Sequence, residues 1–174
     1  IHAGGTGKTP VTIMIGRHFI NKGYDVAVVS RGYKRRNKRN VILPPEQRLP
    51  WDRIGDEPFL IRDNLPEAWV GIGRNRRATT LRITPQLGTK AVYVLDDGFQ
   101  HRQLHRNCDI VCVPSAPLED YAIPAGTLRE PFASLQRADC ICMYRSGENS
   151  EMTEMRVEQM KRFVGHNRVY PFYY

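Results

Sequence analysis

A glycine-rich segment near the start of the chain has the residue types that bind a nucleotide phosphate chain. It reads Gly-Gly-Thr-Gly-Lys-Thr-Pro at positions 4–10 and stands directly before a helical pattern of apolar residues. Glycines let the backbone wrap a phosphate with its N–H groups pointing inward, and a helix start attracts the same anion. In such loops the lysine reaches the β- and γ-phosphates and the next hydroxyl binds Mg²⁺. The segment therefore predicts a nucleotide and Mg²⁺ site formed by Gly4, Gly5, Thr6, Gly7, Lys8, Thr9 and Pro10.

Two details of the sequence refine this prediction. The usual phosphate-loop pattern begins with glycine six positions before the lysine, and this chain has His2 there. A guanine-reading Asn-Lys-x-Asp motif is missing, because the segment from Asn21 to Asp25 has the wrong spacing. We therefore expect ATP as the nucleotide. The alternative for the loop is a glycine turn without a ligand.

Two pairs of acidic residues are candidates for metal binding and catalysis. Asp96 and Asp97 follow an apolar run, which places them at the carboxyl edge of a parallel sheet, where ligands bind and carboxylates hold Mg²⁺. Asp56 and Glu57 follow Gly55, and two adjacent carboxylates can divide their roles between metal binding and general base catalysis. The alternatives are an acidic surface turn for the first pair and a helix start with acids near its positive end for the second.

Positive charge is concentrated at positions 31–39, which hold six cations in nine residues, and the whole chain has a formal net charge of +8. Such a surface attracts phosphorylated ligands, nucleic acid or anionic lipid, and charge alone does not choose among them. The segment contains one aromatic residue, Tyr33, which is too few for a platform that stacks single-stranded bases. A solvated loop is the alternative.

Histidine and cysteine give weak metal signals. His101 and His105 are four residues apart, but no nearby Glu completes a zincin-like pattern, and His101 is better placed as a polar group at the rim of a site. The cysteines stand in apolar runs at spacings that differ from common zinc patterns. We expect these cysteines to be reduced core thiols, which indicates a reducing compartment, and a four-cysteine metal site is the alternative. The four residues are Cys108, Cys112, Cys140 and Cys142.

The secondary-structure elements that must position these residues alternate between helices and strands. Helices are expected at 11–20, 57–63, 74–87 and 151–163, and strands at 25–30, 68–72, 91–95, 109–113, within 137–144 and at 169–173; 41–53 is expected to be irregular and 116–131 a loop. Strands that are apolar throughout and alternate with helices predict an α/β, P-loop NTPase-like fold with a mostly parallel sheet and helices on both faces. No linker composition divides the 174 residues, so one domain, truncated at both ends, is expected.

Six motifs in this order resemble those of the tetraacyldisaccharide 4'-kinase family of lipid A biosynthesis. The resemblance extends from Gly4 to about Asp139, most of the chain. Its motifs are Gly4–Pro10, Ser30–Tyr33, Gly55–Pro58, Gly73–Arg76, Leu95–His101 and Pro124–Pro131.

The resemblance implies transfer of the γ-phosphate of ATP to the 4'-hydroxyl of a tetraacylated disaccharide 1-phosphate, with Mg²⁺. It also implies work at the cytoplasmic face of a bacterial inner membrane. By motif position, Asp56 is the expected base for the sugar hydroxyl, with Lys8 on the phosphates, and Thr9, Glu57, Asp96 and Asp97 organise Mg²⁺ and water. The residues expected to line the acceptor or support the site are Tyr33, Arg76, Gln100, His101, Arg129 and Glu130. With this resemblance, the basic segment 31–39 is expected to contact the 1-phosphate or anionic lipid head groups.

The chain departs from the family pattern in three places. We expect the family's N-terminal membrane-associated segment and much of its C-terminal part to lie outside these 174 residues, and Thr127 stands where proline is expected. We expect a monomer at an anionic membrane surface, with no nucleic-acid partner. Two alternatives stay open: a P-loop switch ATPase with a protein partner, and a nucleic-acid-binding module suggested by the net charge alone.

Overall fold

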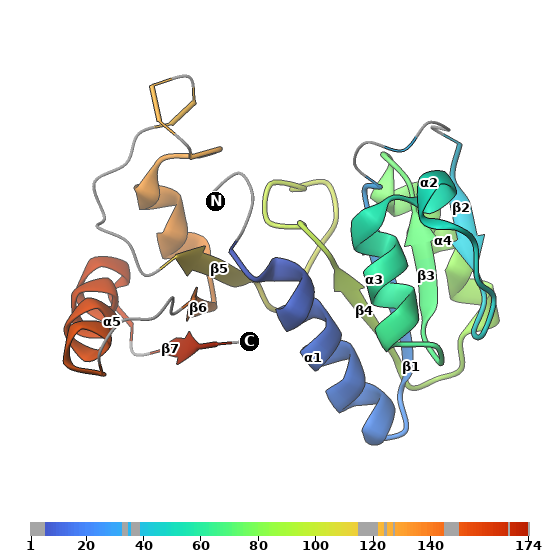
Figure 1. The fold of residues 1–174 in the computed structure, drawn as a ribbon, viewed down its shortest axis with the longest axis horizontal. Helices are drawn as coiled ribbons and strands as arrows, with labels where there is room; N and C mark the ends of the chain where they lie inside the picture. The colour runs from blue at the N-terminus through green and yellow to red at the C-terminus, as the bar shows by residue number, and fades with distance from the viewer. Residues whose placement is uncertain are drawn as a thin grey trace. The chain divides into compact units, whose positions relative to one another are not determined.

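The computed structural model describes residues 6–32, 35, 39–114, 122–123, 125–126, 128–144, 150–166 and 168–173. The chain divides into two compact units, one of residues 9–104 and the other of residues 1–8 together with 105–174. Each unit has its own β-sheet (Figure 1). That the two units work as one kinase domain stays a prediction.

The unit of residues 9–104 contains a four-stranded sheet in the order β2-β3-β1-β4. Strand β1 pairs in parallel with both β3 and β4, and β2 runs antiparallel at the edge beside β3. The prediction of a mostly parallel sheet is therefore confirmed. The elements are α1 (Lys8–Asn21), β1 (Asp25–Ser30), β2 (Val41–Leu43), α2 (Trp51–Ile54), α3 (Asp56–Asn64), β3 (Trp69–Ile72), α4 (Arg76–Ile83), the 3₁₀ turn η1 (Thr84–Gln86) and β4 (Ala91–Leu95).

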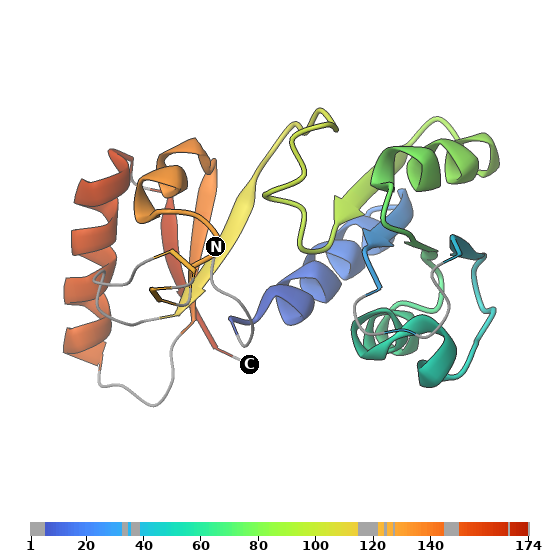
Figure 2. The same cartoon turned by 90° about the horizontal axis from the view of Figure 1, so that it is seen from above.

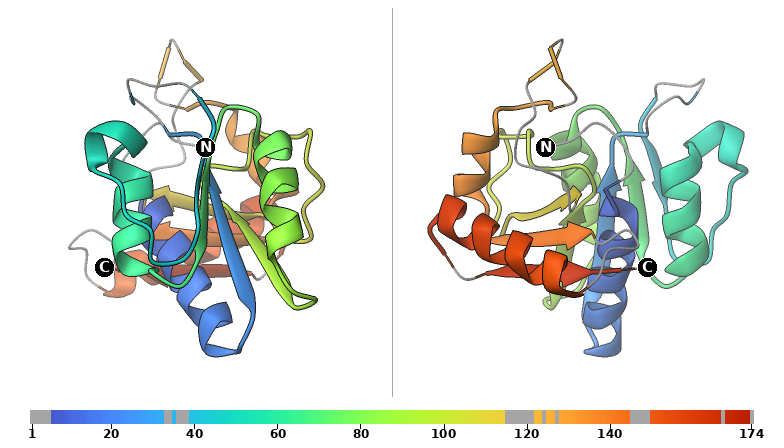
Figure 3. Two further views of the ribbon diagram at one scale, coloured as in Figure 1. Left: turned by 90° about the vertical axis from the view of Figure 1, so that its right-hand side faces the viewer. Right: turned by 60° about the vertical axis from the view of Figure 1, so that its left-hand side comes forward.

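Helices cover both faces of this sheet, as the apolar runs of its strands predict. Because successive side chains of a strand point to opposite faces, Val26 and Val28 pack in one layer while Ala27 and Val29 pack in the other. The first layer holds apolar side chains of α1, α2 and α3, and the second holds Ile83 of α4. Figure 3 (left) shows α3 and α4 on opposite sides of the strands.

Two expectations for this unit were wrong in detail. The segment 41–53, expected to be irregular, contains the short strand β2 and the start of α2. The helix expected over 74–87 ends at Ile83 and continues as η1, because Pro85 cannot donate a backbone hydrogen bond. At its start, the side chain of Asn75 accepts a hydrogen bond from the N–H of Ala78 at 3.0 Å and caps α4.

The other unit contains a three-stranded parallel sheet in the order β5-β6-β7, with helix α5 beside it (Figure 2). Ile141 and Met143 of the central strand are buried, as is Met160 of α5. Most of the loop expected over 116–131 lies outside the described residues. The elements are β5 (Ile110–Pro114), the 3₁₀ helix η2 (Phe132–Arg137), β6 (Cys140–Tyr144), α5 (Ser150–Val164) and β7 (Val169–Phe172).

None of the helices formed by the described residues is both long enough and apolar enough to cross a membrane.

Candidate active site

Asp96 is the centre of a buried polar cluster at the carboxyl edge of the four-stranded sheet. It follows β4 directly, and its N–H donates to the carbonyl of Val29 at 3.0 Å, which extends the parallel ladder by one residue. The Thr12 hydroxyl on α1 donates to Oδ1 of Asp96 at 3.5 Å, and the Ser30 hydroxyl at the end of β1 donates to Oδ2 at 3.3 Å. With 1% of its surface exposed, this carboxylate is held by hydroxyl groups from two elements.

A tight turn separates Asp96 from Asp97. Asp97 has a φ of 53°, in the left-handed region that Asp tolerates better than most residues, and its side chain is half-buried. Gly98 follows, and a Cβ added there would lie 2.7 Å from the Cβ of Leu95 and 3.1 Å from its carbonyl oxygen. The Asp-Asp-Gly sequence therefore turns the chain immediately after β4 and gives its two carboxylates different exposure.

Ser30 also organises the start of the basic segment. Its carbonyl accepts from the N–H of Gly73 at 3.0 Å, and its Oγ accepts from the N–H of Gly32 at 3.5 Å. Arg35 is 8% exposed and donates from Nη2 to the carbonyl of Ile72 at 3.5 Å, and burial lowers the pKa of its guanidinium. The reading of 31–39 as a wholly solvated loop is therefore wrong for Arg35.

The glycine-rich segment is described from Thr6 onward, while Gly4 and Gly5 lie outside the described residues. Gly7 has a φ of 75°, a conformation that glycine adopts without steric cost. Lys8, the first residue of α1, donates from Nζ to Oγ1 of Thr6 at 3.2 Å. Thr9 and Pro10 follow in the first turn and are half-buried, as expected for residues at the start of the helix.

Asp56 and Glu57 form the first turn of α3 and are exposed. Gly55, with a φ of 91°, joins α2 to α3 and allows the abrupt change of direction there. Helix α3 leads through a short turn into β3, so it runs antiparallel to that strand and begins at the carboxyl edge of the sheet. Topology thus puts both acids at the same edge as Asp96, and they also gain from the positive end of their helix.

Three residues expected near the acceptor follow the same sheet edge. Arg76 begins α4, directly after its cap residue, and is 5% exposed. Gln100 and His101 are half-buried in the loop after the Asp-Asp-Gly turn, where the N–H of His101 donates to the carbonyl of Gly98 at 2.8 Å. These positions come after β3 and β4, as the motif order predicts.

The remaining acceptor candidates are distributed differently. Arg129 is exposed and Glu130 half-buried, and both belong to the unit that contains β5. A carboxylate oxygen of Glu130 accepts from Nη2 of Arg137 at 2.8 Å. Tyr33 lies outside the described residues.

Thr12 and Ser30, the two hydroxyl residues that hold Asp96, were not predicted from the sequence. A signal for Ser30 was present, because a hydroxyl residue directly follows the apolar run 26–29 and opens one of the ordered motifs. Thr12 gave a weaker signal, one helical turn after Thr9 on the same side of α1.

The donor set around Asp96 fits a hard cation. Carboxylate and hydroxyl oxygens are the ligands that Mg²⁺ prefers, and in nucleotide sites it takes one or two carboxylates and completes its shell with phosphates and water. Over the part of the chain that the structure describes, no three side chains of His, Cys, Asp and Glu gather into a metal-binding cluster.

The cysteines lie in the other unit and are free. Cys112 of β5 is directly opposite Cys142 of β6 in the parallel register. A hydrogen bond between these two thiols raises the pKa of Cys142 to about 11, with burial adding to the effect, and lowers the pKa of Cys112. Cys108 is exposed, so the expectation of four core thiols is wrong at that position.

The parallel sheet between helices, the glycine-rich start of α1 and the acid after β4 define the class: an α/β protein of the P-loop kinase type. A family model described as tetraacyldisaccharide-1-P 4'-kinase matches residues 1–171. The chain therefore belongs to the tetraacyldisaccharide 4'-kinase family, as the ordered motifs predict.

Curated relatives agree with this assignment. The tetraacyldisaccharide 4'-kinase of Aquifex aeolicus is 34% identical over 95% of this chain and 49% of its own length. That of Porphyromonas gingivalis is 39% identical over 90% of this chain and 44% of its own length. The chain thus spans about half the length of the curated relatives that it matches.

A solved structure has the same fold. The crystal structure of LpxK from Aquifex aeolicus, described as an apo form in complex with ATP, matches with a TM-score of 0.74 and 25% identity. The match covers 100% of this chain and 68% of that one, and it confirms the predicted fold class.

Proposed function

We propose that the protein containing this chain transfers the γ-phosphate of ATP to the 4'-hydroxyl of a tetraacyldisaccharide 1-phosphate, a step of lipid A biosynthesis. The observation that carries the proposal is the family match over residues 1–171. The buried Asp96 cluster supports it, because a carboxylate held by hydroxyls at the carboxyl edge of a parallel sheet suits a nucleotide site.

In this proposal the start of α1 binds the phosphates of ATP. Backbone N–H groups of the segment 4–10 surround the phosphate chain, and the positive end of the helix adds to the attraction. Lys8 supplies a mobile positive charge beside Thr6, which offsets the charge that develops on the transferred phosphoryl group. Binding at this position orients the γ-phosphate toward the edge of the sheet.

Asp56 accepts the proton of the acceptor hydroxyl. As the 4'-oxygen of the acceptor forms the new bond to the γ-phosphorus, the bond between that phosphorus and the β–γ bridging oxygen breaks, and ADP leaves. Phosphoryl transfer is mostly positioning and charge stabilisation, so Asp56 need not be a strong base. Its exposed place in the first turn of α3 leaves it accessible to a sugar hydroxyl.

The oxygen donors of this edge fit Mg²⁺, and we assign Thr9, Glu57, Asp96 and Asp97 to it directly or through water. When bound, Mg²⁺ neutralises charge on the β- and γ-phosphates. Thr12 and Ser30 donate to both carboxylate oxygens of Asp96 and so fix its orientation.

The acceptor is a phosphorylated glycolipid, so the proposal also places the protein at an anionic membrane surface on the cytoplasmic face of the inner membrane, as a monomer. The exposed Arg31 and the other cations of the segment 31–39, apart from the buried Arg35, meet the 1-phosphate or lipid head groups. Residues assigned to the acceptor or to supporting the site are Tyr33, Arg76, Gln100, His101, Arg129 and Glu130.

The test uses the full-length protein that contains this chain, with γ-labelled ATP and the acceptor in detergent micelles. A matched acceptor with its 4'-hydroxyl blocked is the control. The proposal predicts labelled lipid from the first acceptor and none from the second. Release of labelled phosphate without labelled lipid from either acceptor would contradict the proposal and support the switch-ATPase alternative.

A further inference from the structure

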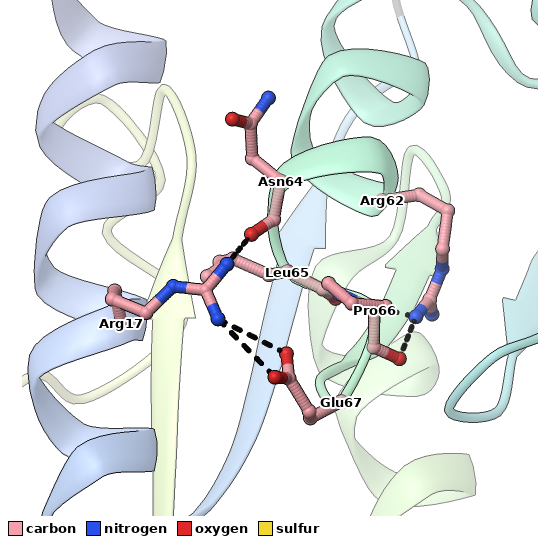
Figure 4. Close-up of polar contacts among 6 residues, drawn as sticks. All are labelled: Arg17, Arg62, Asn64, Leu65, Pro66 and Glu67. Carbon is pink, nitrogen blue, oxygen red and sulfur yellow. Dashed lines mark hydrogen bonds and ion pairs between the residues drawn. The ribbon is translucent and has the colours of Figure 1, made fainter.

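Arg17 connects the helix that begins with the phosphate-binding residues to the helix that begins with Asp56. From α1, its Nη1 contacts both carboxylate oxygens of Glu67 at 3.2 and 3.3 Å, and its Nη2 donates to the carbonyl of Asn64 (Figure 4). Asn64 is the last residue of α3, and Glu67 lies in the turn that leads to β3. A single guanidinium thus bridges α1 and the end of α3.

The backbone of α1 also lies against the side chain of Leu65, the residue that follows α3. A Cβ added to Gly16 would lie 2.5 Å from Cδ1 of Leu65, a side chain that is buried in the core under α1 and α3. A Cβ at this position would overlap Leu65, so glycine lets the backbone of α1 lie against that side chain. The ion pair and the close approach are therefore adjacent parts of one contact.

The turn that Arg17 grips is itself fixed to the sheet. Arg62 is 2% exposed, and its Nη1 donates to the carbonyls of Leu65 at 3.3 Å and Pro66 at 2.7 Å. Its Nη2 donates to the carbonyl of Leu43, in β2, at 3.1 Å. Figure 4 shows Arg62 and Arg17 on either side of this turn. A guanidinium that joins three carbonyls leaves the turn little freedom, so α1 is held against a rigid support.

The contact has a consequence at the opposite ends of the two helices. Both helices pack on the same face of the sheet and lead into parallel strands, so they run in the same direction. Thr9 lies eight residues before Arg17, and Asp56 lies eight residues before Asn64. At about 1.5 Å of rise per residue, each is about 12 Å from the contact.

We propose that Arg17 is a positioning residue that sets the axial register of α1 against α3, so that Asp56 lies level with Thr9. The inference rests on the proposed function, because it assigns a purpose to this register. The acceptor base and the phosphate-binding turn are kept at the same level along the two helix axes, at the carboxyl edge of the sheet. The Gly16–Leu65 contact implies the same register to within about two residues, by the same count along each helix.

A second ion pair, which involves α3 but not α1, provides the control. Arg48 contacts Asp63 of α3 at 3.1 Å, and both side chains are exposed, but Arg48 does not belong to α1. If Arg17 were only another surface ion pair, substituting either arginine would have a similarly small effect. The proposal requires them to differ.

The first experiment compares Arg17→Ala, Arg17→Lys and Arg48→Ala in the full-length protein. For Arg17→Ala we expect kcat to fall by about ten- to a hundredfold, the loss typical of a misplacement near 1 Å, with the KM for ATP unchanged. Arg17→Lys should recover part of the loss, and Arg48→Ala should match the wild type. Equal kcat in Arg17→Ala and Arg48→Ala would overturn the proposal. Glu67→Gln, which keeps the Asn64 contact, should give a smaller loss of kcat and serves if Arg17→Ala does not fold.

The second experiment needs no catalysis and so separates this inference from the proposed function. Spin labels are attached through Met14→Cys on α1 and Leu60→Cys on α3, both exposed positions, in a Cys108→Ser background. Arg17→Ala should broaden or shift the distance distribution between the labels, and Arg48→Ala should not. An unchanged distribution in Arg17→Ala would overturn the register claim. A changed distribution in Arg17→Ala, together with a wild type that makes no labelled lipid, would keep the register and refute the kinase.

Discussion

The hydroxyl of Ser30 donates to Oδ2 of Asp96 at 3.3 Å, and both residues are buried although 66 positions separate them in the chain. The contact joins the last residue of β1 to the residue after β4, strands that are neighbours in the sheet. It gives a carboxylate with almost no access to water a hydrogen-bond donor, without which its burial would be costly. The parallel register of β1 and β4 thus builds part of the proposed metal site directly.

Replacing Ser30 with Ala tests this contact. The substitution leaves Oδ2 of Asp96 buried with one donor fewer, so we expect the free energy of unfolding to fall by about 1–3 kcal/mol. Urea unfolding measures the change. Ser30→Thr keeps the hydroxyl and should lose less. If Ser30→Ala is as stable as the wild type, the hydrogen bond does not stabilise the carboxylate.

Replacing Asp96 with Asn tests its assignment to Mg²⁺. The amide keeps the shape of the side chain and can still hydrogen-bond, but it removes the charge that attracts the cation. We expect Mg²⁺-dependent ATP binding to weaken by about tenfold or more, the effect of at least 1.4 kcal/mol. Calorimetric titration of ATP with and without Mg²⁺ measures it, and Asp63→Asn, at an exposed position of α3, is the control. Equal Mg²⁺ dependence in Asp96→Asn and the wild type would remove Asp96 from the site.

The close contact of Gly16 in α1 with the side chain of Leu65 predicts that Gly16→Ala destabilises the fold. The added methyl group overlaps Cδ1 of Leu65, which is enclosed in the core and has little room to move. Overpacking of this kind costs about 1–3 kcal/mol. Met14→Ala, at an exposed position of the same helix, should change stability by about 0.5 kcal/mol or less. Thermal unfolding of the two variants compares them, and a Gly16→Ala variant as stable as Met14→Ala would show that Gly16 does not pack closely against Leu65.

The thiols of β5 and β6 predict a loss of stability at alkaline pH. The pKa of Cys142 is raised to about 11 in the folded protein, from an ordinary value of 9.0. The folded state therefore keeps a proton that the unfolded state loses, so this contribution is complete below about pH 9 and disappears as the pH rises through about 11. The lowered pKa of Cys112 acts in the opposite direction.

Melting temperatures between pH 8 and 11 measure this effect. A hydrogen bond with Cys142 raises the pKa of Cys140, and burial raises the pKa of Cys108, so the net expectation is a decline above pH 9. The decline should be smaller in Cys142→Ala. A Cys142→Ala variant whose melting temperature falls as steeply as that of the wild type would show that this thiol does not cause the decline.

The local pattern of apolar residues was sufficient to predict the strands that lie in the hydrophobic core. The runs 26–29 and 91–95 are largely apolar, and they lie in β1 and β4, the paired strands on which Asp96 depends. Strand β2 was missed because its three residues, Val41–Leu43, precede two prolines and have no strong pattern of their own. Its pairing is supplied by β3, a neighbour distant in sequence.

Site residues could be predicted where a short sequence segment contains the reactive residue types, and not where their role depends on a tertiary contact. Asp96 and Asp97 stand out because two acids end an apolar strand. Thr12 could not be assigned from the sequence, since its role is a hydrogen bond to a residue 84 positions away. Arg35 looked like one cation among six and is instead buried against the carbonyl of Ile72.

Phosphate transfer by the full-length protein with Asp56→Asn tests the central claim most directly. The matched control is Asp52→Asn, which removes an exposed carboxylate from the first turn of α2, one helix earlier. With γ-labelled ATP and tetraacyldisaccharide 1-phosphate, we expect labelled lipid from the wild type and Asp52→Asn. In Asp56→Asn the rate should fall by about a hundredfold or more, with ATP binding unchanged. Labelled lipid formed equally fast by Asp56→Asn would contradict the assignment of the base, and no labelled lipid from a wild type that binds ATP would contradict the kinase itself.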